Sequence, residues 1–163
     1  MRIRKNFFVS YARADDPLPT RLLELLRLRL AIMQGFDCDA WIDTMIPVGA
    51  DWRREIDAAL ARCDFGLLLL SPGFFASRFI SGQELPHFLG LGPDGGIGIR
   101  KPIVPVGLKA APLDGSADLK GLDRIQIFRD SQNRWFNRTR GQVSETFTDQ
   151  LVAAIAAKLK AHP

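Results

Sequence analysis

The sequence lacks the features of several protein classes. It has no apolar run of about 18 residues, so it predicts no transmembrane helix. Its basic start, residues 1–5, is not followed by a hydrophobic core, so we expect no secretory signal and a cytoplasmic location. Its two cysteines, Cys38 and Cys63, fit neither a disulfide framework nor a metal site, and we expect both to be reduced and buried.

Length and composition suit one globular domain. The chain has 163 residues, of which 47% are hydrophobic and 25% charged, and its net charge of +4 does not by itself imply nucleic acid. Residues 37–64 hold seven acids against three bases, and residues 124–140 hold five arginines against one acid. The arginine-rich stretch is either a solvated surface or an anion-facing patch. Trp135 within it is a weak signal for nucleic acid, and a surface loop is the favoured interpretation.

Short apolar segments alternate with helical patterns along the chain. We expect strands at residues 6–11, 38–43, 65–70, 103–108 and 125–128. We expect helices at residues 20–33, from 51 to about 63, at 74–91 with interruptions at Gly82 and Pro86, and along the stripe Phe147, Leu151, Ile155 and Leu159. This alternation predicts an α/β fold: a five-stranded parallel sheet of flavodoxin-like order 2-1-3-4-5 with helices on both faces.

Local signals refine this prediction. Pro105 cannot donate to a sheet ladder, which predicts a bulge or an edge position for the fourth strand. Asp51 is a candidate N-cap for the second helix, and Ser144 or Thr146 for the last one. The glycines of residues 91–98 predict a flexible loop, and no Gly-Lys-Ser/Thr follows to make it a phosphate loop.

The predicted topology nominates a site. Ligands of open parallel sheets bind beyond the carboxyl ends of the strands where the strand order reverses, here between the first and third strands. The side chains expected there are Ser10, Tyr11, Arg13, Asp43, Trp52, Phe75, Ser77, Phe79 and Glu84.

Several of these residues have a purely structural alternative. Arg13 fits a solvated loop, and Trp52 fits a core residue at the start of a helix. Asp43 fits a residue that closes a turn. Glu84 fits a capping box with Ser81, in which its carboxylate folds back to the backbone of Ser81. His87 stands without metal partners and is interpreted as structural.

Four segments in order resemble the motifs of TIR (Toll/interleukin-1 receptor) domains. Phe-Phe-Val-Ser-Tyr at 7–11 resembles the opening motif, and residues 41–49 resemble the second strand with its BB loop. Residues 65–80 resemble the third strand and the loop after it, and Gln83-Glu84-Leu85 follows where bacterial TIR domains carry a glutamate. The resemblance implies one TIR domain over residues 1–163. Since the sequence ends just after a helix, two alternatives stay open: a protein of this one domain, or the N-terminal part of a longer multidomain protein.

The resemblance also implies an activity. Many bacterial TIR domains cleave NAD⁺ to nicotinamide and ADP-ribose or a cyclic variant, which makes Glu84 the expected catalytic residue and NAD⁺ the substrate, with no cofactor and no metal. The usual Trp-Cys pair before the glutamate is Phe79-Ile80 here, which keeps an aromatic surface and removes the thiol. The expected role is that of an effector in bacterial immunity. The alternative is a non-catalytic interaction module, either a scaffold or a host-mimicking factor.

TIR domains commonly associate through the BB loop, which implies that other TIR domains and a sensor domain or partner chain are partners. Membrane and nucleic acid are not expected partners of this domain. The assembly loop comprises Ile46, Pro47, Val48 and Gly49. The first helix carries Leu23, Leu30 and Met33 outside its main apolar stripe, so we expect further apolar surface there.

Overall fold

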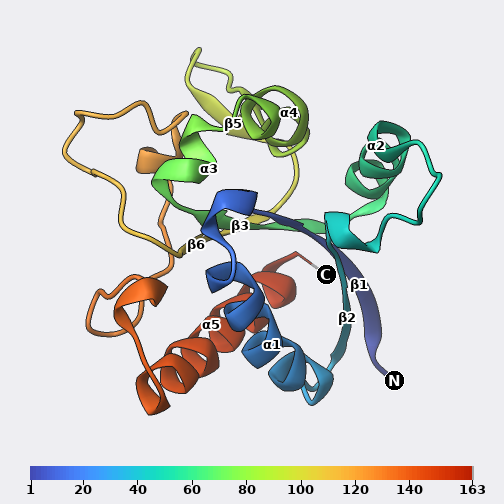
Figure 1. Ribbon diagram of the computed structural model, residues 1–163, viewed down its shortest axis with the longest axis vertical. Coiled ribbons are helices and arrows are strands. Elements are labelled where there is room, and N and C mark those ends of the chain that lie inside the picture. Colours follow the sequence, from blue (N-terminus) through green and yellow to red (C-terminus); the bar gives the residue numbers. More distant parts are fainter. Residues whose placement is uncertain (163) are drawn as a thin grey trace.

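The computed structural model describes residues 1–162 as an open parallel sheet with helices on both faces (Figure 1). The sheet has the order β2-β1-β3-β6, with every pair parallel. Its strands are β1 (Ile3–Ser10), β2 (Phe36–Trp41), β3 (Phe65–Leu70) and β6 (Ile103–Gly107). The predicted α/β class and the order 2-1-3-4 of the first four predicted strands are confirmed.

The predicted fifth strand, residues 125–128, is wrong in extent. It is reduced to one parallel bridge between Val106 and Phe128. Phe128 N–H donates to Pro105 O (2.7 Å), and Gly107 N–H donates to Phe128 O (2.8 Å). Pro105 has no N–H that could donate a hydrogen bond on this outer side of β6, and only its carbonyl takes part in the pairing with residues 125–128. The predicted edge position of Pro105 is therefore confirmed.

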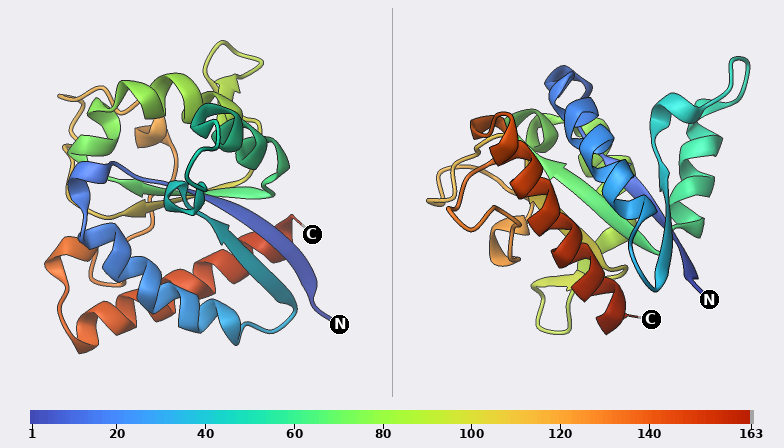
Figure 2. Two further views of the ribbon diagram at one scale, coloured as in Figure 1. Left: turned by 45° about the vertical axis from the view of Figure 1, so that its right-hand side comes forward. Right: turned by 90° about the horizontal axis from the view of Figure 1, so that it is seen from below.

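Two helical layers cover the sheet (Figure 2). On one face α1 (Leu18–Ala31) and α5 (Gln142–Ala161) pack side by side over strand residues that include Phe7 and Leu67. On the other face α2 (Trp52–Arg62), α3 (Pro72–Ala76) and α4 (Leu85–Phe88) pack over residues that include Phe8 and Leu68. Because successive strand side chains point to opposite faces, the apolar run of β3 supplies both cores.

The first helix corrects one expectation. Leu30 and Met33 are buried in the core between α1 and the sheet, and Leu23 is half-buried against it, so they do not form an extra outer face. The exposed apolar residues of this segment are Leu28 and Ile32. The helix ends before the predicted stop, and Met33 reaches the core from the turn that follows it.

The segment after β3 is more broken than the predicted helix at 74–91. It contains α3, a π-helical turn η3 (Ile80–Glu84) and α4, and then a hairpin of β4 (Leu89–Leu91) and β5 (Ile97–Ile99). The expected flexible loop at 91–98 is thus largely this hairpin, because Gly95 adopts a left-handed conformation and closes the turn with Gly92.

The helix ends test the predicted caps. The Asp51 side chain accepts from Arg54 N–H at the start of α2, as predicted. Neither Ser144 nor Thr146 caps α5, because this helix already begins at Gln142, and Ser144 is buried inside its first turn. The predicted core stripe of α5 is confirmed.

The cysteines partly match the expectation: Cys63 is buried, Cys38 is only half-buried, and both are free thiols. Within residues 1–162, no helix is both long and apolar enough to cross a bilayer.

Candidate active site

A pocket of about 620 Å³ lies beyond the carboxyl ends of β1 and β3. Its walls come from the loop after β1 with the 3₁₀ turn η1 (Arg13–Asp15), from the start of α2, and from the segment that joins α3 to η3. The Ser71 hydroxyl donates to Asp15 and accepts from Phe74 N–H, which ties η1 to the beginning of α3. Two of the nine predicted site residues, Ser10 and Phe75, do not line this pocket, and the other seven do.

Glu84 lies in the pocket wall and is only 7% exposed. Ser10 Oγ donates to Glu84 Oε1 at 2.6 Å, between two residues 74 positions apart in the chain. The pKa of Glu84 is raised to about 7. Burial is the largest cause, the Ser10 hydrogen bond partly offsets it, and the nearby charge of Asp43 adds to the rise. Glu84 is thus a carboxyl group that changes charge near neutral pH, beside an open cavity.

The capping-box interpretation of Glu84 is wrong. The chain is already helical at Phe79, and Ser81 N–H donates to Ser77 O, so no helix begins at Ser81. The Glu84 carboxylate bonds to Ser10 instead. Ser10 is therefore the partner of Glu84 rather than a residue that faces the cavity.

Arg13 and Asp43 form an ion pair at the rim. Arg13 Nη2 and Nε lie 2.9 and 3.1 Å from Asp43 Oδ2, and the Arg13 side chain is largely exposed. Among the residues described, the buried Oδ1 of Asp43 has no hydrogen-bond partner. Asp43 also begins the turn η2 (Asp43–Met45), where its carbonyl accepts from Ile46 N–H, so the turn interpretation and the site interpretation both apply.

Tyr11 lies beside this ion pair. Burial, with the nearby carboxylates of Asp43 and Asp16, raises the pKa of Tyr11 to about 12. Tyr11 is therefore a neutral phenol at physiological pH, able to donate one hydrogen bond into the pocket.

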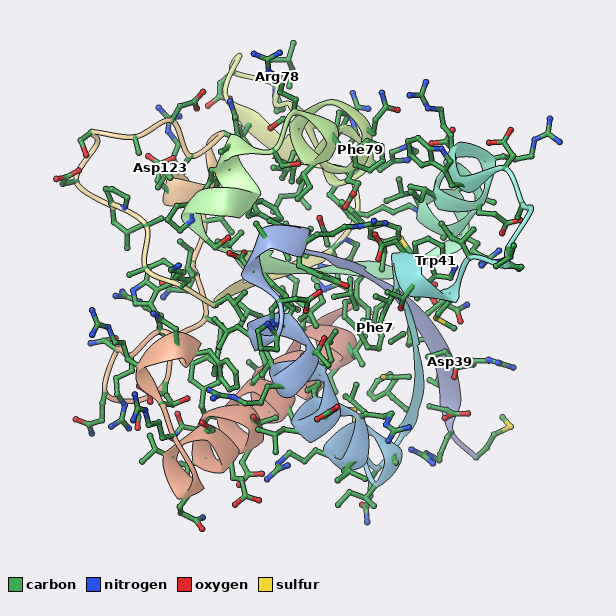
Figure 3. The ribbon with its side chains drawn as sticks, in the orientation of Figure 1. Phe7, Asp39, Trp41, Arg78, Phe79 and Asp123 are labelled. Atoms are coloured by element: carbon green, nitrogen blue, oxygen red, sulfur yellow. The ribbon has the colours of Figure 1, made fainter. Side chains whose placement is uncertain are left out.

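Two aromatic rings make the apolar part of the pocket. Trp52 and Phe79 lie 5.5 Å apart between centroids at 52°, where Phe79 sits between α4 and α2 (Figure 3). Trp52 is 49% exposed, so the core interpretation of this residue is wrong. Phe75 instead packs edge-on against Phe74 and does not line the cavity.

Sequence reasoning missed several lining residues. Ala12 and Gly73 contribute backbone and small side chains, and a Cβ on Gly73 would stand 3.3 Å from Ala12 Cβ. The sequence does not identify such residues, because they carry no reactive or polar side chain and contribute only by being small. Ile56 follows Trp52 by one helical turn, and that spacing could have identified it.

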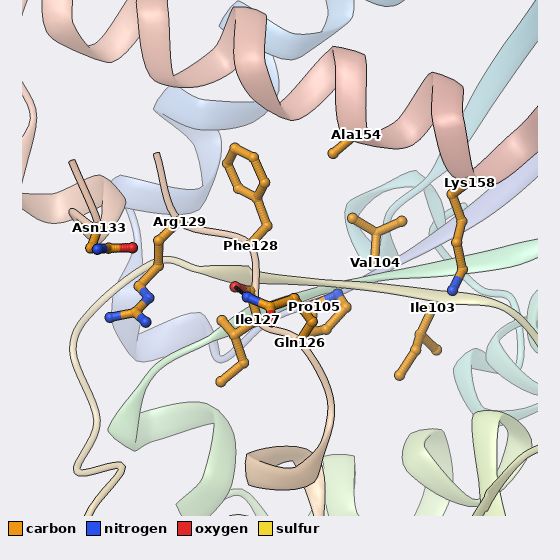
Figure 4. Close-up of a pocket in the computed structure, with 10 residues that line it drawn as sticks. All are labelled: Ile103, Val104, Pro105, Gln126, Ile127, Phe128, Arg129, Asn133, Ala154 and Lys158. Atoms are coloured by element: carbon orange, nitrogen blue, oxygen red, sulfur yellow. Dashed lines mark hydrogen bonds between the residues drawn. The ribbon is translucent and has the colours of Figure 1, made fainter. Parts of the chain in front are cut away.

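A second hollow of about 260 Å³ lies at the outer edge of β6 (Figure 4). It is lined by residues of β6, of the chain around Phe128, and of α5, including Arg129 and Lys158. Within residues 1–162, no carboxylate lines it. The surface-loop interpretation of Trp135 is wrong, because Trp135 is 8% exposed and packs under Gly107. Burial by itself would raise the pKa of Asp130, but hydrogen bonds from the backbone and side chain of Arg134 and from Gln132 N–H hold it below its usual range.

The comparison with known families agrees with this fold. A family model described as TIR domain matches residues 7–142, which is most of the chain. The chain therefore belongs to the TIR domain family. No curated protein sequence matches it.

Proposed function

We propose that this TIR domain hydrolyses the bond between nicotinamide and ribose in NAD⁺, with Glu84 as the catalytic residue. The observation that carries the proposal is a buried carboxylate, poised near neutrality, in the wall of a pocket with aromatic and cationic side chains. A perturbed carboxyl group in such a cavity is a candidate catalytic group on physical grounds. With water as the acceptor of the ribosyl cation, the products are nicotinamide, ADP-ribose and a proton; capture by the adenine of the same molecule, in place of water, gives a cyclic variant.

One carboxylate suffices for this chemistry. Breaking the nicotinamide–ribose bond passes through an oxocarbenium-like state, and the pyridinium ring leaves as a neutral molecule, so no general acid is needed. Ser10 fixes one oxygen of Glu84 and leaves the other for the ribose. The cationic nicotinamide ring favours the ionised form of Glu84 when NAD⁺ binds. Electrostatic stabilisation by one such preorganised group lowers the activation free energy by about 2.7–4 kcal/mol.

The remaining groups suit the rest of the dinucleotide. Trp52 and Phe79 offer ring faces for the nicotinamide or the adenine. Arg13 can turn from Asp43 to the pyrophosphate, since its guanidinium is exposed and its ion pair with Asp43 lies at the surface. Asp43 Oδ1, buried without a partner, then accepts from a ligand N–H or O–H group. No cofactor takes part; NAD⁺ is the substrate.

Assembly controls this activity in our proposal. The assembly loop projects Val48 fully into solvent, with Pro47 and Gly49 exposed and Ile46 half-buried. An exposed apolar loop next to the pocket suits contact with another TIR domain. We propose that a sensor domain or partner chain clusters these domains in the cytoplasm, as in a bacterial immune effector. The same loop supports the second candidate, a non-catalytic interaction module.

The decisive experiment measures nicotinamide release from NAD⁺ by the purified chain, in solution and clustered on beads. Glu84→Gln should lower release by about 100-fold or more while the fold is kept. Glu145→Gln, an exposed glutamate on α5, is the matched control and should release as much as the unaltered chain. Absence of release from the unaltered chain in both formats would favour the interaction module.

The role of the assembly loop has its own test. Val48→Asp should weaken concentration-dependent self-association and remove the gain from clustering, since a charge there opposes apolar contact. Size measured by sedimentation against concentration checks the first effect. A chain that stays monomeric at every concentration and gains nothing from clustering would contradict this part of the proposal.

A further inference from the structure

The pocket wall that carries Glu84 contains one turn of π-helix. Leu85 N–H donates to Ile80 O, five residues earlier. Just before it, Ser81 N–H donates to Ser77 O, four residues earlier, and just after it Leu89 N–H donates to Leu85 O with the same α-helical spacing. The segment is thus an ordinary helical path in which a single turn holds one additional residue.

This additional residue changes which side chains share a face. Phe79 and Glu84 are five residues apart, and both line the pocket. In a regular α-helix that spacing would put their side chains about 140° apart, because each residue turns by about 100°. The wider π-turn brings them to the same side. A regular turn here would rotate Glu84 by about 100° and take its carboxylate away from Ser10.

The sequence explains why a regular helix does not form here. An α-helical path would need residue 86 to donate to the carbonyl of Gly82, and Pro86 has no N–H. Its ring would also clash with that same carbonyl. Gly82 is exposed, so the widened turn bulges into solvent without displacing a packed side chain.

We propose that this π-turn is a positioning device, in which the one additional residue and Pro86 set the angle at which Glu84 meets Ser10 and stands beside Phe79. Pro86 is then a positioning residue, which touches no substrate and acts through Glu84. The effect on catalysis rests on the proposed function, but the placement of the Glu84 carboxylate does not.

Residue spacing tests the proposal. Inserting one alanine between Ser81 and Gly82 makes the spacing from Phe79 to the glutamate six residues. Deleting Gly82 together with Pro86→Ala makes it four, which a continuous α-helix accommodates with the two side chains about 40° apart. An alanine inserted between Ser116 and Ala117, two exposed loop residues, is the control for insertion as such.

Two readouts are measured: the pKa of the glutamate carboxyl by carbon-13 NMR without NAD⁺, and nicotinamide release. The insertion at residue 81 should return the pKa of Glu84 toward 4.5, its ordinary value, and lower release by about tenfold or more. The deletion variant and the loop control should both keep the raised pKa of the glutamate, and the loop control should also keep the nicotinamide release of the unaltered chain.

Two results would overturn the proposal. One is a folded insertion variant that keeps the raised pKa of Glu84. The other is a folded deletion variant whose glutamate titrates like a solvated carboxyl group. If the unaltered chain releases no nicotinamide but the pKa pattern holds, the proposed function fails and the positioning role of the π-turn stands.

Discussion

Replacing Ser10 with alanine tests the link between the first strand and the chemistry of Glu84. Ser10 is buried, and among residues 1–162 its hydroxyl is the one hydrogen-bond donor to the Glu84 carboxylate. The variant removes one oxygen atom and leaves the strand and its apolar neighbours in place. The hydrogen bond favours the ionised carboxylate, so its loss shifts the proton equilibrium of Glu84 in one direction.

The size of the effect follows from the strength of that bond. A hydrogen bond to an ionised group contributes about 1.5–3 kcal/mol, and one pKa unit corresponds to about 1.4 kcal/mol. The pKa of Glu84, about 7 in the unaltered chain, should therefore rise by about one unit or more. The ionised fraction at pH 7 then falls from about one half to about one tenth, so the rate falls about fivefold.

The assay is the pH dependence of kcat/KM for nicotinamide release. In Ser10→Ala the ascending limb should move to higher pH, and the rate should recover toward the unaltered value in alkaline buffer. Ser144→Ala, a buried serine on α5 outside the pocket, is the control and should leave the limb in place. A lower rate at every pH with an unmoved limb would refute the role assigned to Ser10.

Three further predictions concern stability and binding. Folded Glu84 keeps its proton up to about pH 7, but an unfolded glutamate releases it near 4.5, so the free energy of unfolding should fall by up to about 3 kcal/mol as the pH rises through that window. Urea titrations at several pH values measure this fall, and Glu84→Gln should remove it. An equal dependence on pH in both proteins would contradict the prediction. Gly66→Ala should cost about 1–3 kcal/mol, measured as a lower Tm, because its Cβ would stand 2.7 Å from the Phe88 ring; an unchanged Tm would show that Phe88 moves freely. Trp52→Ala should raise KM for NAD⁺ by about threefold to tenfold through lost stacking, with the free energy of unfolding nearly unchanged, since Trp52 is half exposed; an unchanged KM would remove Trp52 from the site.

The fold was largely predictable because its signals are local. The apolar run of β3 is buried on both faces, as a central parallel strand requires. Pro105 marked the outer strand, and Asp51 marked the start of α2. The errors also have local causes. The fifth strand lost its ladder to Pro105, and the helix expected to reach residue 91 ends at Phe88, where the hairpin of β4 and β5 begins.

The site was predictable as a region and less so residue by residue. Topology identified the loops, because the carboxyl ends of neighbouring parallel strands meet at one edge of the sheet. The direction of a side chain on a short helix was not visible in the sequence, so Phe75 was included although it packs on Phe74. Trp135 was assigned to a surface loop because its neighbours are polar, but it fills the space beside Gly107.

By itself, the sequence determined the alternation of strands and helices, the strand order and the position of Glu84 beyond the third strand, since these depend on short-range patterns and on the chirality of the chain. The tertiary structure alone decided the burial, the hydrogen-bond partner and the pKa of Glu84. Its neighbour Ser10 lies 74 positions away, and its burial comes from packed segments that only the fold brings together. A pKa depends on solvation and on nearby charges in three dimensions, and residue order does not specify these.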